Sequence, residues 1–128
     1  LIAIGTEVTD GQILNSNGQW LAQKLIEHHI PIVFHIAVPD DPALIKAALS
    51  FATQNADLFF LSGGLGTTSD ELTRAAVSSF LDKPLVFDPT SWQDVQEKIL
   101  TRGVTLREGH KQQCFFPVEN QSANIEQC

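Results

Sequence analysis

Short apolar runs alternate with amphipathic segments along most of the chain. Residues 1–5, 31–38 and 57–62 are apolar over most of their length, as in central strands of a parallel sheet, which are buried on both faces. Residues 17–28 and 42–54 place apolar side chains at helical spacing between these runs. This alternation predicts an α/β fold of βαβ units with a mostly parallel sheet. The apolar positions at helical spacing are Trp20, Leu21, Leu25 and Ile26 in the first helix and Leu44, Ile45, Ala48, Leu49 and Ala52 in the second.

Acidic residues mark the predicted starts of three helices. Asp40 or Asp41 precedes Pro42, and Asp88 stands before a second proline. An acidic N-cap followed by proline in the first turn is a common way to begin a helix. Asp70 is the predicted N-cap of a further helix that ends near residue 81. Two further strand-like segments are at residues 83–88 and 113–118.

Composition narrows the class of protein. A chain of 128 residues has the length of one domain, and 43% hydrophobic against 18% charged residues argues against disorder. The longest apolar runs fall well short of the roughly 20 residues that a membrane-spanning helix needs, so no membrane partner is expected. The two cysteines, Cys114 and Cys128, have no CxxC spacing and are too few for a disulfide scaffold, which favours a reducing cytoplasm.

The net charge of −7 limits the partners further. Fifteen acidic residues stand against eight lysines and arginines, and no basic cluster offsets them. Nucleic acid is therefore not an expected partner, because phosphate neutralisation supplies most of the affinity for a duplex.

Three loops leave the carboxyl ends of the predicted strands, where open α/β sheets bind their ligands. They comprise residues 5–11, residues 39–41 and a glycine loop at residues 62–71. Together they place a rim of carboxylates at one edge of the sheet. The acidic residues on this rim are Glu7, Asp10, Asp40, Asp41, Asp70 and Glu71.

The glycine loop combines two signals that rarely occur together. Its three glycines, Gly63, Gly64 and Gly66, allow backbone N–H groups to approach a phosphate at the start of the next helix. It matches neither a Walker A loop nor GxGxxG, and on the simplest interpretation Asp70 only caps the helix. Carboxylates repel a naked anion but can hold a divalent cation that bridges protein and phosphate. The residues therefore indicate a metal ion, a phosphate-bearing ligand and no Ser/His/Asp nucleophile.

Four segments in series resemble a known family. They are "IGTEVTDGQILNSNGQWLAQKL", "VPDDPALIKAAL", "DLFFLSGGLGTTSDELTRAAV" and "HKQQCFFP". They look like the N-terminal domain of the CinA (competence/damage-inducible protein) family, within the molybdopterin-binding, MoCF-type superfamily. The family pattern IGTELLxGxIxNTN matches at Gly5, Thr6, Glu7, Gly11 and Asn17, and TGGLGPTxDDLT matches at Gly63, Gly64, Leu65, Gly66, Thr68, Asp70, Leu72 and Thr73. The chain departs from these patterns at Ser62, Thr67 and Glu71.

The resemblance implies a three-layer α/β/α fold, a homo-oligomer and metal-dependent ADP-ribose pyrophosphatase activity. In that scheme Asp70 and Glu71 are catalytic, and the ligands of the divalent cation are Glu7, Asp41, Asp70 and Glu71. The phosphate or nucleotide would be bound by Gly5, Thr6, Asn17, Ser62, Gly63, Gly64, Gly66, Thr68 and Thr73.

Two other functions remain open on the same resemblance. One is the binding of molybdopterin in molybdenum cofactor biosynthesis, and the other is a non-catalytic module for nucleotide sensing or oligomerisation. Residues 1–128 are expected to form one domain that is truncated at both ends. The chain begins inside an apolar run without an initiating Met, and the family continues into an NPxGTAPG segment beyond the last residues. Its full-length members also carry a C-terminal amidohydrolase-like domain, whose activity is not expected of this chain.

Overall fold

The computed structural model describes residues 1–67 and 72–118 of the chain. Its first half is a three-stranded parallel sheet made of β1 (Ile2–Ile4), β2 (Ile36–Val38) and β3 (Leu61–Ser62). The strand order is β2-β1-β3, so β1 lies in the middle. The predicted α/β fold with a parallel sheet is confirmed. No helix in the described ranges is long and apolar enough to span a membrane.

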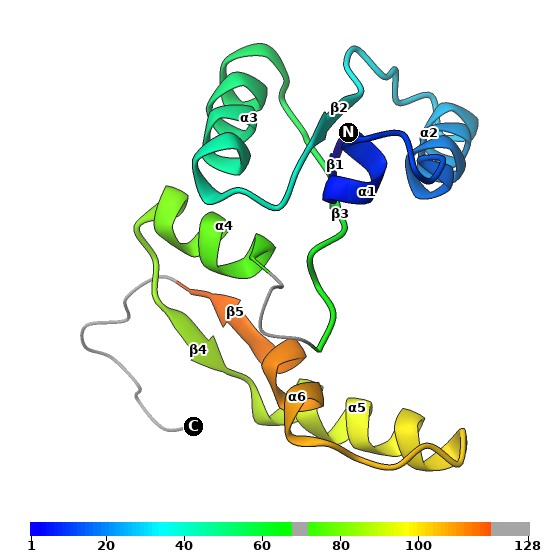
Figure 1. Cartoon of the computed structure of the whole chain (residues 1–128), viewed down its shortest axis with the longest axis vertical. Coiled ribbons are helices and arrows are strands. Elements are labelled where there is room, and N and C mark those ends of the chain that lie inside the picture. The colour runs from blue at the N-terminus through cyan, green and yellow to red at the C-terminus, as the bar shows by residue number, and fades with distance from the viewer. Residues whose placement is uncertain (68–71, 119–128) are drawn as a thin grey trace.

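Helices cover both faces of this sheet. After the short helix α1 (Thr6–Thr9), the chain forms α2 (Ser16–Glu27) on one face and, after β2, α3 (Pro42–Asn55) on the other (Figure 1). The connections from β1 to β2 and from β2 to β3, which are consecutive along the chain, are therefore helical crossovers, as parallel strands require. The arrangement is the expected three-layer α/β/α architecture.

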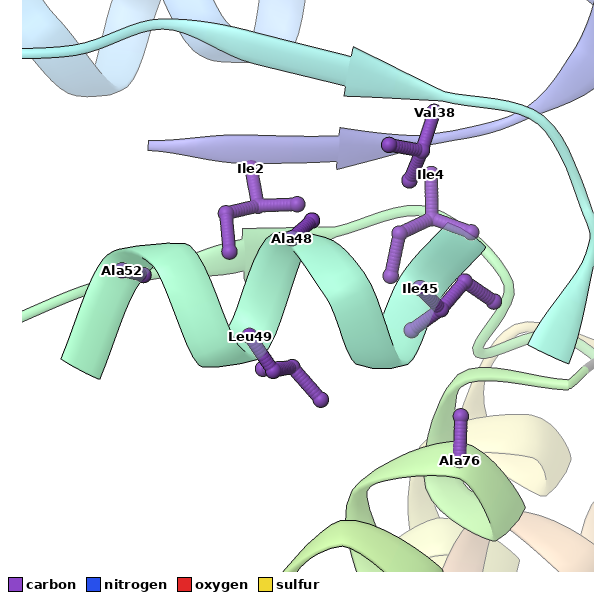
Figure 2. Packing of buried hydrophobic residues seen from close by; sticks show 8 residues of the cluster. All are labelled: Ile2, Ile4, Val38, Ile45, Ala48, Leu49, Ala52 and Ala76. Carbon is purple, nitrogen blue, oxygen red and sulfur yellow. The ribbon is translucent and has the colours of Figure 1, made fainter. Parts of the chain in front are cut away.

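The core lies between the sheet and α3. Ile45 and Leu49 of α3 are completely or almost completely buried and belong to one cluster with Ile2 and Ile4 of β1. Figure 2 shows that Ile2 and Ile4 point towards α3, whereas Leu49 points away from β1. Ala76 joins this cluster from α4 (Thr73–Leu81). Burying each of these large aliphatic side chains stabilises the fold by about 1.5–3 kcal/mol. The α3 positions at helical spacing are buried as the pattern suggests, except Leu44, which is half exposed.

The second half of the chain forms a separate layer below α4. The strands β4 (Leu85–Phe87) and β5 (Phe115–Pro117) pair antiparallel in a sheet of their own. Between them lie the long helix α5 (Pro89–Thr101), the short helix α6 (Glu108–Lys111) and the 3₁₀ turn η1 (Gln112–Cys114). In Figure 1, α4 separates this antiparallel pair from α3 and the parallel sheet. Both strand-like segments predicted here are present, in an antiparallel pair.

The parallel strands are shorter than the apolar runs that predict them. β2 begins at Ile36 rather than at residue 31, and β3 begins at Leu61 rather than at residue 57. The reason is that a strand lasts only as long as its partner, and the central strand β1 has three residues. The remaining apolar residues of both runs border a groove at the amino ends of the strands.

The buried face of α2 is narrower than the amphipathic pattern of the sequence predicts. Leu25 is buried, with 8% of its surface exposed, whereas Trp20 is 61% and Ile26 60% exposed. Gly18 is the other buried residue of this helix. The helix therefore contacts the rest of the protein along a narrow stripe, and the apolar face predicted from spacing is only partly used.

Candidate functional site

The loops after β1 and β3 diverge to opposite faces of the sheet. The chain leaves β1 towards α2 and leaves β3 towards α4, which packs against α3 on the other face (Figure 1). In an open parallel sheet such a switch point leaves a crevice beyond the carboxyl ends of the strands, where ligands bind. A pocket lies there, called the switch-point pocket below. Its lining residues are Ala3, Ile4, Glu7, Val8, Ile13, Leu14, Asn15, Ser16, Asn17, Ser62 and Gly63.

The loop after β1 carries Glu7 into this pocket. Gly5 is buried at the end of the strand, and its N–H donates to the carbonyl of Val38 at 2.9 Å. A side chain on Gly5 would collide with Glu7, because its Cβ would lie 2.6 Å from Glu7 Oε1. The backbone carbonyl of Glu7 accepts from the N–H groups of Gln12 and Ile13, which folds the loop back on itself. The absence of a side chain at Gly5 therefore leaves space for the Glu7 carboxylate.

The amino end of α2 forms another wall of the pocket. Asn15 is the N-cap of this helix, and its side-chain oxygen accepts from the N–H of Gly18 at 2.9 Å. Asn17 lines the pocket from the first turn. The motif signal identified Asn17 and not Asn15, although an asparagine directly before the amphipathic segment is a typical helix start.

Gly63 and Gly64 bring the glycine loop close to its neighbours. Gly63 has φ +92°, and a Cβ there would lie 1.8 Å from the carbonyl oxygen of Ile4. Gly64 has φ +58°, and its Cβ would lie 2.2 Å from Thr73 Oγ1. Both positions therefore require glycine for conformation and for space. The glycines that the sequence associates with phosphate binding also allow the loop to pack against β1 and α4.

Thr73 holds the first part of the glycine loop. Its side chain is 2% exposed, and its hydroxyl donates to the carbonyl of Gly63 at 2.8 Å. The N–H of Thr73 donates to the carbonyl of Gly64 at 3.3 Å. Thr73 was predicted to bind phosphate or nucleotide, and its hydroxyl is engaged with the protein backbone behind the pocket.

Arg74 holds the next part of the loop, and the motif comparison did not identify it. Its guanidinium donates to the carbonyl of Leu65 at 3.0 Å and to that of Gly66 at 3.2 Å. Gln113 of η1 also approaches the Leu65 carbonyl, at 3.4 Å. An arginine on an amphipathic helix is usually assigned to the solvated face, so no sequence signal distinguishes it from the other basic residues.

Two predicted site residues serve the neighbouring loop instead of the pocket. Thr6 donates its N–H at 2.9 Å and its hydroxyl at 3.1 Å to the same carboxylate oxygen of Asp40. Asp41 is the N-cap of α3, where one carboxylate oxygen accepts from the N–H groups of Ala43 and Leu44. Neither Thr6 nor Asp41 lines the switch-point pocket. The predicted cap at the start of α3 is confirmed and belongs to Asp41.

Three predicted site residues, Thr68, Asp70 and Glu71, lie outside the described residues. Helix α4 begins at Thr73 with Leu72 in its N-cap position, which is later than the start predicted at Asp70. Within residues 1–67 and 72–118, no three histidine, cysteine, aspartate or glutamate side chains gather as a metal site would require. Glu7 is the predicted cation ligand that the structure brings into the pocket, together with Asn17, Ser62 and Gly63.

Comparisons with known proteins agree with this fold. A family model described as "Probable molybdopterin binding domain" matches residues 1–122. A "CinA-like protein" of Dictyoglomus thermophilum is 38% identical over 116 residues, which make up 91% of this chain and 28% of that protein. A "Putative competence-damage inducible protein" of Streptococcus uberis is 42% identical over 102 residues, 80% of this chain and 24% of that protein.

A solved structure has the same architecture. The crystal structure of the protein CinA, of unknown function, from Thermoplasma acidophilum superimposes with a TM-score of 0.74 at 25% identity. The match covers 95% of this chain and 74% of that one. The chain spans 28% and 24% of the length of the two curated relatives above. From the family match and these relatives, the chain belongs to the molybdopterin-binding, MoCF-type domain family, in its CinA-like form.

Proposed function

We propose that this domain binds a phosphate-bearing small molecule of the nucleotide or pterin class and hydrolyses the pyrophosphate of ADP-ribose or a related nucleotide. The observation that carries the proposal is the position of the switch-point pocket. It lies between the loops after β1 and β3, and it is lined by Glu7, Asn17 and the start of the glycine loop. Pockets at this point of a parallel sheet bind nucleotides in many unrelated proteins.

The pocket has an apolar part as well as a polar one. Ile13 and Leu14 line it from the loop before α2, and their side chains are 52% and 89% exposed. Exposed aliphatic groups beside polar ones suit a ligand that joins a flat ring system to phosphate. Both a nucleotide and a pterin have this composition.

The described residues are compatible with a divalent cation of the Mg²⁺ type. Such an ion prefers oxygen ligands and is often held by one or two carboxylates together with the phosphates of its substrate. The carboxylate of Glu7 and the oxygens of Asn17 and Ser62 in the pocket are ligands of this kind. We infer that Glu7 holds the cation, with Asp70 and Glu71 assigned from the family pattern. Asp41 is dropped from this set because its carboxylate caps α3.

The reaction is the addition of water across the pyrophosphate bond. The oxygen of water bonds to one phosphorus, the bridging P–O bond breaks, and ADP-ribose yields AMP and ribose 5-phosphate. When bound, a divalent cation neutralises phosphate charge and makes a water molecule more acidic. The contribution of the chain is to bind the phosphates at the glycine loop and to place the Glu7 carboxylate beside them.

The test uses the chain with ADP-ribose, with and without Mg²⁺ or Mn²⁺, and follows AMP release. Glu7→Gln and the double variant Asp70→Asn, Glu71→Gln should each lose turnover, because a hard cation loses charged ligands. Both should also bind Mn²⁺ at least roughly tenfold more weakly by calorimetry, as expected when ligands are removed. Asp57→Asn is the matched control, because Asp57 lies at the amino end of β3, away from the pocket. Wild-type turnover in the double variant would show that Asp70 and Glu71 take no part in the reaction.

A second function, binding of molybdopterin, is favoured by the description of the family that matches residues 1–122. Molybdopterin that copurifies with the chain, together with absence of AMP release, would support it over hydrolysis. Phosphate binding without turnover of either ligand would indicate a nucleotide-sensing module. A homo-oligomer and a cytoplasmic location remain predictions from the family resemblance and the cysteine content.

A further inference from the structure

We propose that Arg74 is a positioning residue: it holds the backbone of the glycine loop so that a row of N–H groups faces the phosphates of the ligand. The inference rests on the proposed binding of a phosphate-bearing ligand at the switch-point pocket. It assigns to a side chain outside the family pattern the task of shaping that site.

The first two residues of α4 bind four consecutive carbonyl groups of the loop. Thr73 takes two of them, through its hydroxyl and its N–H. Arg74 takes the next two with two nitrogens of one guanidinium, at 3.0 and 3.2 Å. The four accepting residues are Gly63, Gly64, Leu65 and Gly66.

The direction of these carbonyls sets the direction of the N–H groups. Each peptide is planar and trans, so its N–H points opposite to its C=O. Carbonyls drawn towards the start of α4 therefore turn four N–H groups away from it, those of Gly64, Leu65, Gly66 and Thr67. Within the described residues, none of these four groups donates a hydrogen bond to the protein. A run of N–H groups left without a protein acceptor in this way can form an anion-binding concavity.

Arginine suits this task better than lysine. A guanidinium presents several N–H donors in a rigid planar fork and can bind two neighbouring carbonyls at once, whereas an ammonium is a single mobile point. Among the described residues, the ion pair found is Lys24 with Glu27, and no described carboxylate pairs with Arg74. Its positive charge therefore lies directly behind a loop proposed to hold an anion. The charge of Arg74 and the direction of the loop N–H groups both favour the binding of phosphate.

Loop order without ligand tests the positioning directly. In Arg74→Met the carbonyl of Gly66 loses its donor and that of Leu65 keeps only Gln113, so ¹⁵N relaxation should show greater mobility for residues 65–67. Arg74→Lys should fall between Arg74→Met and the wild type. Arg102→Met is the matched control, because Arg102 is an exposed arginine at the end of α5 and its removal changes the net charge equally. A loop that is equally ordered in Arg74→Met and in the wild type would overturn the proposal.

Affinity for inorganic pyrophosphate in the presence of Mg²⁺ tests the consequence for the ligand. Arg74→Met should bind it roughly tenfold more weakly or worse, the loss expected when hydrogen bonds to a charged group are misaligned. Millimolar guanidinium should restore part of the affinity, which a general loss of stability would not allow. Wild-type affinity in Arg74→Met, or a wild type that binds no pyrophosphate, would contradict the inference. Intact pyrophosphate binding and a weakened Arg74→Met, without AMP release, would instead contradict only the proposed hydrolysis.

Discussion

Gly63 is the residue at which the glycine loop comes closest to β1. Its φ of +92° lies in the region that glycine favours, and the carbonyl oxygen of Ile4 occupies the place of a Cβ. Gly103, after α5, has a similar left-handed conformation with φ +67°, but no atom lies within 4 Å of its Cβ position. Alanine substitutions at the two glycines therefore distinguish the free-energy cost of a left-handed conformation from the cost of a steric clash.

Gly63→Ala should lower the free energy of unfolding by about 2–5 kcal/mol. This sum combines about 1–2 kcal/mol for a left-handed alanine with about 1–3 kcal/mol for overpacking. Gly103→Ala, the control, should cost only the conformational part, about 1–2 kcal/mol. Urea denaturation of both variants measures the difference. Equal losses in the two variants would show that β1 and the loop separate more easily than the structure indicates.

Cys114 is a free and completely buried thiol at the end of η1. Burial raises the pKa of this thiol, the carboxylate of Asp88 raises it further, and Arg74 opposes the shift. A buried thiol with a raised pKa is present as the unreactive protonated form. Cys114 is therefore a small apolar residue of the interior, whereas Cys128 lies outside the described residues.

Helix α5 begins with the N-cap Asp88, whose carboxyl group can be followed by titration. One carboxylate oxygen of Asp88 accepts from the hydroxyl of Ser91 at 2.5 Å and from its N–H at 2.9 Å. These hydrogen bonds, the hydroxyl first, lower the pKa of Asp88 below its ordinary value near 3.8. Because the carboxylate is favoured in the folded state, its contribution to stability is present above about pH 4 and is lost as the pH falls through the lowered pKa.

Ser91→Ala should raise the pKa of Asp88 back towards its ordinary value, since the strongest of these bonds is removed. The part of the stability that depends on Asp88 should then change less between neutral and acid pH. NMR titration of the Asp88 carboxyl carbon measures the pKa, and Ser79→Ala on the exposed face of α4 is the control. An unchanged pKa in Ser91→Ala would mean that the backbone N–H groups alone set it.

Helix α4 connects the two halves of the molecule. Its sides pack against α3 in the first half and β5 in the second (Figure 1). Its first two residues bind the glycine loop, and Gly109 of α6 approaches the same loop so closely that its Cβ would lie 2.4 Å from the carbonyl oxygen of Thr67. The layer that contains β4 and β5 thus contacts the glycine loop, whose first residues line the switch-point pocket of the parallel sheet.

The net charge of −7 leads to a prediction for the whole molecule. An acidic protein repels phosphates over the range of its field, so nucleotide affinity should be weak without a cation. Mg²⁺ or Mn²⁺ should tighten ADP-ribose binding, and added NaCl should reduce the repulsion measured in chelator, because salt screens exposed charges. Calorimetry in excess chelator and in excess cation measures both effects. Equally tight binding in the two conditions would exclude the cation from the site.

Local signals in the sequence determined most of the elements and part of the pocket lining. The apolar runs around Ile2 and Leu61 predict strands because a central parallel strand needs apolar residues on both faces. Asp41 and Asp88 predict helix starts because a carboxylate satisfies N–H groups that the first turn leaves open. Gly63 and Gly64 predict a close backbone approach because only glycine lacks a Cβ. Each of these signals depends on atoms within a few residues of one another.

Tertiary structure decided which of these residues work together. Strand lengths followed from the three residues of β1, because a ladder needs a partner on the neighbouring strand. Thr6 forms hydrogen bonds with Asp40, which is 34 residues away in the sequence. Arg74 forms hydrogen bonds with the glycine loop at residues nine and eight positions before it. A guanidinium that binds two carbonyls has no period or motif in the sequence, since the match exists only once α4 lies behind the loop. The pocket itself arises from strand order, because the divergence of α2 and α4 leaves the space that Glu7 and Gly63 line.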